Sequence, residues 1–319
     1  MAQQFPLTIN ENAQLERATS RGTLTLILTA MRPYQWTKNL FLLAPLLFGM
    51  KLGNQSALIN AAMGTIAFCL LSSALYILND IVDADADRAH PQKRLRPIAS
   101  GALSTPIAIS TMLLLLVLAF PLAFLIGLKF GLLALTYCLV TLAYCFAFKH
   151  AIVLDGMLIA TGFVLRVVAG AIAVNVLPTH WLVVCAFLLA LFLAFSKRRQ
   201  ELLTLSADAA HHRKVLGLYT VGYLDRANNI LLAATIVCYA LYTVAPETVN
   251  RFGTDKLIYG SVFVIYGLLR YLALLQNSEN GGNPSKMLLK DMPLLLAIVG
   301  WAIYNFLVIY RLPLSFLKQ

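Results

Sequence analysis

The stretch NDIVDADADRAHPQKRLRPIASG, which begins at Asn79, concentrates four aspartates and four lysine or arginine residues between two apolar runs. If the preceding apolar run is a helix that continues into this stretch, side chains follow one another at about 100° per residue. Asp85 then points away, and three carboxylates and one amide share one face. These residues are Asn79, Asp80, Asp83 and Asp87. Carboxylates this close repel unless a cation lies between them, and hard oxygen ligands suit Mg²⁺. The pattern predicts a Mg²⁺ site, the alternative being a solvated helix end.

Basic residues follow these acids directly. Lys93, Arg94 and Arg96 lie in a segment punctuated by proline and glycine. Arginine matches phosphate oxygens with two parallel hydrogen bonds, and lysine acts as a point charge. An acidic metal site beside a basic loop suits a diphosphate, because fixed cations stabilise the charge that develops as it departs. The tendency of cytosolic loops to be basic also explains these residues, but it does not explain their proximity to the acids.

The composition predicts the elements that must position this stretch. Apolar residues make up 60% of the chain and charged residues 12%, with a mean hydropathy of +0.76, whereas a soluble domain is about a quarter charged. A bilayer-spanning helix needs roughly 20 mostly apolar residues. We therefore expect an all-α polytopic membrane protein with about nine spans, the first of them weakened by Pro45, Gly49 and Lys51. The spans are expected near 37–53, 56–78, 106–127, 129–148, 151–175, 179–196, 228–246, 256–276 and 291–310.

The distribution of lysine and arginine predicts the orientation. Most of the 25 lie on the side of the N-terminus, which places that side in the cytosol of a plasma-membrane protein. Residues 1–22 are polar, without the apolar region of a signal peptide, and are expected to be a cytosolic tail. Residues 23–319 form one transmembrane domain, with cytosolic active-site loops at 79–105 and 197–227.

Other features favour structural roles. The five cysteines lie in apolar runs without a CxxC pair, as expected of small buried side chains. His211 and His212 belong to a polar loop and lack zinc-ligand spacing. The basic cytosolic face could also bind anionic lipid. No nucleic-acid partner is expected, because no basic–aromatic binding module accompanies the charge.

The acidic stretch and its loop resemble the first Asp-rich motif of the UbiA-type intramembrane prenyltransferase superfamily, with NDxxDxxxD as the most specific part. MRPYQWTKN, at 31–39, is similar to the start of that superfamily's first helix. The resemblance extends along the whole helical chain. It implies nine helices around a central cavity, with Mg²⁺-bound diphosphate at the cytosolic mouth.

The sequence departs from that family where a second Asp-rich motif usually follows the sixth span. Here the chain reads LFLAFSKRRQELLTL, with Lys197, Arg198 and Arg199 and the single early carboxylate Glu201. A cationic cluster in place of metal ligands favours a pocket that holds more phosphate groups than one diphosphate.

Further charges agree with this interpretation. Arg166 lies inside the fifth expected span, where a charge costs roughly 2.5–3.5 kcal/mol and is normally partnered and functional. Asp155 shares a face with Arg166, but lies roughly 16 Å away along the axis and cannot touch it directly. A structural pairing of Arg166 with another helix is the alternative. Lys38 lies near the cytosolic end of the first helix.

The departure narrows the resemblance to the branch of decaprenyl-phosphate phosphoribosyltransferases. That branch is similar in RPYQWTKN, the acidic block, LDGMLIATGFVLRVVAGAIA, FSKRRQEL and GGNPSKMLLKD. The resemblance implies transfer of 5-phosphoribose from phosphoribosyl diphosphate to a polyprenyl phosphate in the bilayer. The product is a lipid-linked sugar precursor of cell-envelope polysaccharide, such as arabinan.

Residue roles follow from this resemblance. Mg²⁺ is held by Asp80, Asp83 and Asp87, with Asn79 assisting, while Lys93 and Arg94 act in catalysis by withdrawing charge from the diphosphate. The acceptor phosphate attacks C1 with inversion. The remaining substrate-binding candidates are Lys38, Arg96, Asp155, Arg166, Lys197, Arg198 and Tyr219. Tyr219 and Tyr223, one helical turn apart, are equally typical of tyrosines at a membrane interface.

Two other functions remain open. One keeps the fold but joins a polyprenyl diphosphate to an aromatic acceptor, as in quinone or haem biosynthesis; the missing second Asp-rich motif argues against it. The other is a transporter or flippase without chemistry, which predicts matching broken spans in two halves, and no such repeat is visible. The sequence leaves a homo-oligomer open.

Overall fold

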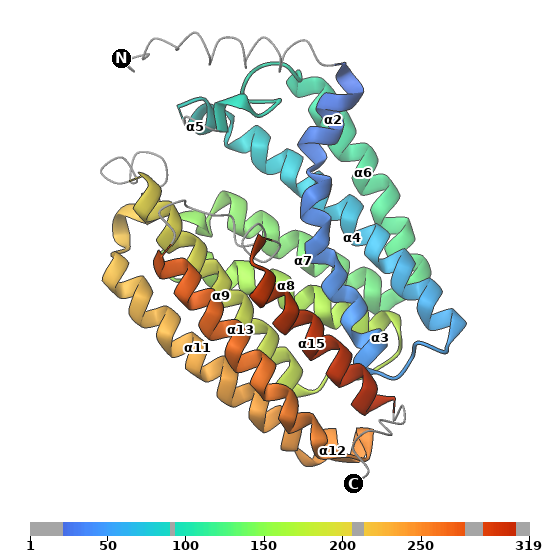
Figure 1. The fold of residues 1–319 in the computed structure, drawn as a ribbon. Helices are drawn as coiled ribbons and strands as arrows, with labels where there is room; N and C mark the ends of the chain where they lie inside the picture. Colours follow the sequence, from blue (N-terminus) through green and yellow to red (C-terminus); the bar gives the residue numbers. More distant parts are fainter. Residues whose placement is uncertain (1–21, 90–92, 206–213, 278–289, 311–319) are drawn as a thin grey trace. The chain divides into compact units, whose positions relative to one another are not determined.

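The computed structural model describes residues 22–89, 93–205, 214–277 and 290–310. Within these ranges the chain is helical and contains no β-strand (Figure 1). Among the described residues, eight helices are long and apolar enough to cross a membrane, so the predicted class of multi-pass α-helical membrane protein is confirmed. They are α4 (Gln55–Val82), α6 (Thr105–Ile126), α7 (Leu128–Phe146), α8 (Leu154–Ala173), α9 (His180–Leu205), α11 (Val221–Val244), α13 (Ser261–Asn277, extended by η6, Lys256–Gly260) and α15 (Met292–Ile309).

The structure differs from the prediction at the first of the nine expected spans. Around 37–53 the chain forms η1 (Pro33–Leu43) and α3 (Ala44–Phe48), and neither is long enough to cross a bilayer by itself. Pro45 lies in the first turn of α3, and Gly49 ends it. Proline fits the first turn of a helix but removes a hydrogen bond in its interior, so the residues that weakened this span in the sequence also divide it.

The chain divides into two compact units. One comprises Met1–Leu40 and Ala62–Phe146, and the other comprises Phe41–Ala61 and Ala147–Gln319. The assignment of 23–319 to a single transmembrane domain, with a tail before it, stays a prediction, and residues 1–21 of that tail lie outside the described residues.

In the first unit, α2 (Thr23–Met31) and α6 pack against α4 around a small apolar cluster. The buried members are Leu26, Ala30, Ala74, Ile77, Ile98, Leu103, Ala108 and Leu115. Two hydrogen bonds then fix the end of α2: Ser73 Oγ donates to the Met31 carbonyl at 3.0 Å, and Trp36 Nε1 donates to Ser73 Oγ at 3.0 Å. The residue after α2, Arg32, is therefore anchored to α4.

In the second unit, α9 packs against both α8 and α11, and α13 packs against α11 and α15; Figure 1 shows α9, α11, α13 and α15 side by side. Glycine permits one especially close approach. A Cβ at Gly170 of α8 would lie 1.9 Å from the Leu42 carbonyl oxygen, so only a residue without a side chain fits there.

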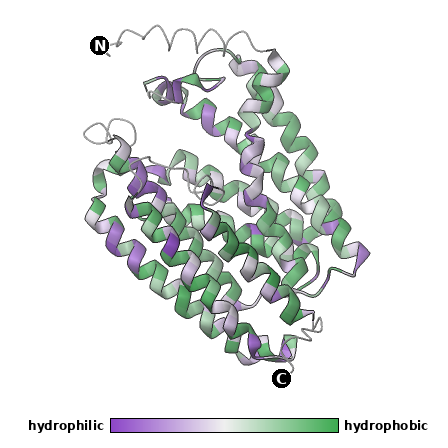
Figure 2. Ribbon diagram, in the orientation of Figure 1, coloured by the Kyte–Doolittle hydropathy of each residue, from purple (hydrophilic) through white to green (hydrophobic). Residues whose placement is uncertain are grey.

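The outer surface of the long helices is apolar. In α6, Val117 is 66% exposed and Leu125 is 75% exposed, and Figure 2 shows hydrophobic residues along the long helices, with hydrophilic ones on α5 (Ala84–Ala89). Large exposed apolar patches mark contact with lipid or partners, which agrees with membrane-spanning helices.

Candidate functional site

The acidic stretch is helical, as predicted. After α4 ends at Val82, the backbone continues with Asp83 N–H donating to Asn79 O at 2.9 Å and Asp87 N–H donating to Asp83 O at 2.8 Å. The short helix α5 thus prolongs α4. Asp85 points outward with a side chain that is 95% exposed, where it pairs with Arg88.

Two of the predicted carboxylates meet around one cation. Asp80 and Asp87 are 2% and 3% exposed. Arg96 Nη1 lies 3.0 Å from Asp80 Oδ1 and 2.5 Å from Asp87 Oδ2. A second guanidinium, that of Arg32, donates from Nη2 to the same Asp80 oxygen. Burial raises the pKa of Asp87, while Arg96 and Lys93 oppose that rise.

The other two residues of the predicted face pair with each other. Asn79 Nδ2 donates to Asp83 Oδ2 at 3.0 Å, and Cys145 Sγ donates to Asn79 Oδ1 at 3.4 Å. Across the described ranges, no three His, Cys, Asp or Glu side chains are gathered as metal ligands. The binding of Mg²⁺ by Asp80, Asp83 and Asp87 together stays a prediction.

The donor set nevertheless fits Mg²⁺. This ion usually keeps several waters and is held by one or two carboxylates together with substrate phosphates. Asp80 and Asp87 supply two carboxylates that already face a common cation, the Arg96 guanidinium. Lys93 and Arg94 lie in η2 (Lys93–Leu95), which packs against α5, and Lys93 acts on the charge of Asp87.

A second charged cluster forms where α8 begins. Asp155, in the first turn of α8, is fully buried. Its Oδ2 accepts a hydrogen bond from Arg198 Nε at 2.7 Å, and its Oδ1 accepts one from the Tyr219 hydroxyl at 2.8 Å. Arg198, from α9, is 1% exposed and also donates from Nη1 to Glu201 Oε2 at 2.8 Å. Three sequence-predicted residues therefore come together: Asp155, Arg198 and Tyr219.

Backbone strain accompanies this cluster. Val153 has φ +66°, which is a genuine outlier for a β-branched residue. Its N–H donates to the Tyr219 hydroxyl at 2.7 Å, so the same tyrosine secures Val153 and Asp155. Burial and the bond to Asp155 raise the pKa of Tyr219, which keeps the hydroxyl protonated. Strain of this kind is concentrated at functional sites.

The rest of the basic motif is also paired. Lys197 is exposed, with Nζ 3.8 Å from Glu201 Oε1. Arg199 Nε donates to Asp225 Oδ1, and Arg199 Nη1 donates to the Leu275 carbonyl at 3.0 Å. Arg199 thus connects α9 to α11 and α13, which is a structural role.

Arg166 and Lys38 have their own partners. Arg166 is 5% exposed, and its Nη1 donates to the Gly162 carbonyl at 2.8 Å, whereas Asp155 binds Arg198. This agrees with the expectation that Arg166 and Asp155 do not touch. Lys38 Nζ donates to Gln35 Oε1 at 2.8 Å. His211 and His212 lie outside the described residues.

Sequence reasoning missed Arg32. It lies 48 residues before Asp80, and spacing along the chain does not connect them. The available signal was Pro33, which disfavours the helical conformation at the preceding residue and so predicts that α2 ends there. Arg32 indeed has φ +54°.

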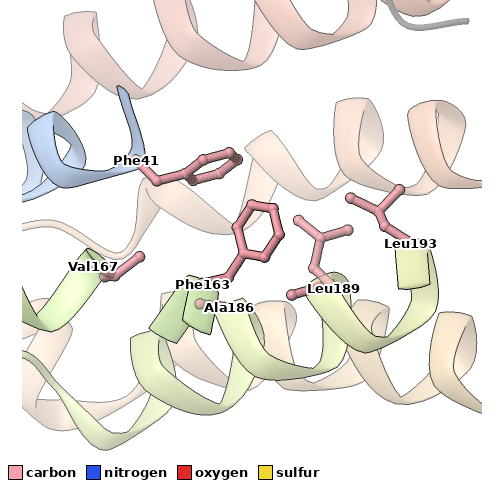
Figure 3. Close-up of a pocket in the computed structure, with 7 residues that line it drawn as sticks. Phe41, Phe163, Val167, Ala186, Leu189 and Leu193 are labelled. Atoms are coloured by element: carbon pink, nitrogen blue, oxygen red, sulfur yellow. The ribbon is translucent and has the colours of Figure 1, made fainter. Parts of the chain in front are cut away.

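An apolar pocket lies between η1, α8 and α9 in the second unit (Figure 3). The Phe41 and Phe163 rings meet edge to face, 5.6 Å apart. Arg166 Cζ lies 5.6 Å from the centre of the Phe163 ring, so a buried cation adjoins the pocket. The labelled lining residues are Phe41, Phe163, Val167, Ala186, Leu189 and Leu193.

Comparisons with known proteins agree on one family. Residues 42–299 match the model of the UbiA prenyltransferase family. The chain is 33% identical to the decaprenyl-phosphate phosphoribosyltransferase of Corynebacterium glutamicum, over 90% of this chain and 88% of that protein. It is 31% identical to the protein of the same name from Mycolicibacterium smegmatis, over 92% of this chain and 95% of that protein.

A solved structure shares the fold. It is that of a UbiA homolog from Archaeoglobus fulgidus bound to DMAPP and Mg²⁺, with a TM-score of 0.69, 22% identity, and coverage of 90% of this chain and 99% of that one. At this identity the comparison supports the fold alone.

Proposed function

Because the chain belongs to the UbiA prenyltransferase family, we propose that it transfers 5-phosphoribose from phosphoribosyl diphosphate to a polyprenyl phosphate, in a Mg²⁺-dependent reaction. The observation that carries this proposal is the similarity to two decaprenyl-phosphate phosphoribosyltransferases along nearly their whole length. The family resemblance seen in the sequence is thereby confirmed. We place the reaction at the cytosolic face of the plasma membrane, where the basic loops are expected.

The first cluster suits the donor diphosphate. Asp80 and Asp87 would hold Mg²⁺, with Asp83 and Asn79 adjoining them on the same helix end. When bound, Mg²⁺ supplies positive charge to the departing diphosphate. In many enzymes, the largest single contribution to catalysis comes from fixed hydrogen-bond donors and cations that point at the charge developing in the transition state.

The basic residues of the η2 loop contribute the remaining positive charge. Lys93 and Arg94 are partly buried, Lys93 lies close enough to act on the charge of Asp87, and Arg96 already faces both carboxylates. As the C1–O bond breaks, the electron pair leaves with the diphosphate, where these cations stabilise it. The attacking phosphate oxygen is already an anion, so little general-base assistance is required.

The second unit offers cations for the other phosphate groups. Asp155, Glu201 and Tyr219 orient Arg198, so its guanidinium is fixed rather than mobile. Lys197 is exposed on the same helix end. These cations stand where the family usually has its second Asp-rich motif. This replacement supports substrates that together carry more phosphate groups than a single diphosphate.

Arg166 and the apolar pocket suit the lipid acceptor. The buried Arg166 guanidinium lies beside Phe163, so a positive charge adjoins the apolar surface of the pocket. A polyprenyl phosphate has the matching chemistry, with an anionic head and a hydrocarbon chain. We assign the pocket to part of that chain.

The deciding experiment offers membranes containing the protein two substrate pairs. Phosphoribosyl diphosphate with polyprenyl phosphate should give a phosphoribosylated lipid, inverted at C1, and free diphosphate. Prenyl diphosphate with an aromatic acid should give no product. Turnover of the second pair alone would overturn the proposal in favour of the aromatic prenyltransferase.

Metal dependence provides the first mutational prediction. Chelation with EDTA should abolish transfer, and added Mg²⁺ should restore it. Asp80→Asn should lower activity by more than about 100-fold, since even outer-shell partners of metal ligands contribute 10–100-fold. Asp85→Asn, on the exposed side of the same helix end, should retain activity. Normal turnover by Asp80→Asn would instead favour a protein without this chemistry.

A further inference from the structure

The acidic cluster already contains its own cations. Asp80, which is almost fully buried, receives two guanidiniums, from Arg32 and from Arg96, and Arg96 Nη1 also serves Asp87. Both arginines are well shielded, with side chains 14% and 26% exposed. Two positive charges therefore stand where a divalent cation would otherwise neutralise the carboxylates.

Arg32 is directed at Asp80 by the backbone. Pro33 prevents Arg32 from continuing α2, and Arg32 adopts a left-handed conformation with φ +54°. Ser73 secures the preceding carbonyl, that of Met31, to α4. The guanidinium also lies over the Tyr76 ring, 5.4 Å from its centre. Arg32 thus has an uncommon backbone conformation and is held by the Met31 carbonyl bond, the Tyr76 ring and Asp80. Such constraints indicate a positioned group rather than a chance surface contact.

We propose that Arg32 and Arg96 are internal counter-ions that make divalent-cation binding depend on diphosphate. A bare cation entering between Asp80 and Asp87 would leave a shielded guanidinium without its carboxylate, and an unpaired buried charge is strongly unfavourable. A cation that arrives with diphosphate brings oxygens that accept the same guanidinium hydrogen bonds. The two ligands are therefore positively coupled, and each raises the affinity for the other. This inference deepens the proposed function and rests on it only for the identity of the anion.

The coupling is measured by binding rather than by turnover. Mn²⁺, which reports its bound state by electron paramagnetic resonance, is titrated into the purified full-length protein alone and as its preformed complex with inorganic diphosphate. The wild type should bind the complex more tightly than bare Mn²⁺. Arg32→Gln should tighten the binding of bare Mn²⁺ and weaken that of the complex, reducing the ratio of the two affinities by about tenfold.

Opposite changes for two ligands distinguish this role from a merely structural one, because damage to the fold would weaken both. Arg88→Gln is the matched control. It removes the same charge, from α5 next to Asp87 in the chain, but Arg88 contacts Asp85 and the Ala99 carbonyl instead of the buried carboxylates. If Arg32→Gln does not yield folded protein, Arg96→Gln takes its place with the same expectation.

Each result has a defined meaning. Weaker or unchanged binding of bare Mn²⁺ by the Arg32→Gln protein overturns the inference, and so does an equal effect of Arg88→Gln. A wild type that binds the complex and transfers phosphoribose, with no opposed changes in the variant, overturns the inference while the proposed function stands. A wild type that binds neither ligand overturns both.

Discussion

At the scale of single residues, the two clusters handle buried charge in different ways. Asp80 pairs with two guanidiniums, those of Arg32 and Arg96, and shares the second with Asp87, which suits an arrangement that can be exchanged for a ligand. Asp155 is instead fully buried and has a separate partner on each oxygen, Arg198 and Tyr219. We interpret the first as a binding centre and the second as a support that fixes Arg198.

This difference predicts the effect of Asp155→Asn on stability. The substitution removes a charge beside Arg198, which is 1% exposed, and breaking a buried pair commonly costs about 3–5 kcal/mol. We expect the free energy of unfolding to fall by about 3 kcal/mol. This is the lower end of the range, because Arg198 Nη1 still donates to Glu201 in the variant. Unfolding of the purified protein in detergent measures it. Asp85→Asn, which breaks an exposed pair, should change stability by less than about 1 kcal/mol; equal losses would contradict our interpretation.

At the scale of elements, close helix approach depends on a few small residues. Gly170 lets α8 contact the backbone at Leu42, and small residues at such points are typical of membrane helix pairs. Pro33 and Pro45 act in the opposite way: Pro33 separates α2 from η1, and Pro45 lies where η1 gives way to α3, inside the first expected span. The break has a use, because the end of α2 is what directs Arg32 at Asp80.

Two matched substitutions test the packing. Gly170→Ala would place its Cβ 1.9 Å from a carbonyl oxygen, and such overpacking costs about 1–3 kcal/mol. Gly267→Ala, in α13, meets its nearest neighbours at 3.8 Å, so it should be neutral or stabilising by about 0.5–1 kcal/mol through helix propensity. Thermal unfolding of both variants checks the pair. Equal behaviour would mean that Gly170 is not a contact point.

At the scale of the whole molecule, the distribution of positive charge predicts how the chain is oriented in the membrane. The acidic stretch and the basic motif lie at helix ends that are expected on the cytosolic side, whereas the connection before α13 is expected on the opposite side. Alternation along eight candidate spans gives this expectation a direct test.

Cysteine labelling in intact cells should reveal the orientation. Asp85 and Asp255 are both exposed, and Asp255 precedes the span that ends at Gln276. A membrane-impermeant maleimide should label Asp255→Cys from outside and Asp85→Cys only after permeabilisation. The wild type, whose five cysteines lie in candidate spans, is the blank. Labelling of Asp85→Cys in intact cells would reverse the orientation.

The sequence by itself determined the fold class, eight of the nine expected spans, each of which matches a candidate membrane helix among the described residues, and the direction of Asp85. It could do so because apolar length and the 100° helical turn are local properties. It also identified the charged residues of both clusters except Arg32. Only the tertiary structure decided which of them are partners: Arg32 with Asp80 across 48 residues, and Arg198 with Asp155 across 43. The reason is physical, since buried charges pair with whatever helix packing brings within hydrogen-bond distance, and packing between distant segments has no periodic trace in the sequence.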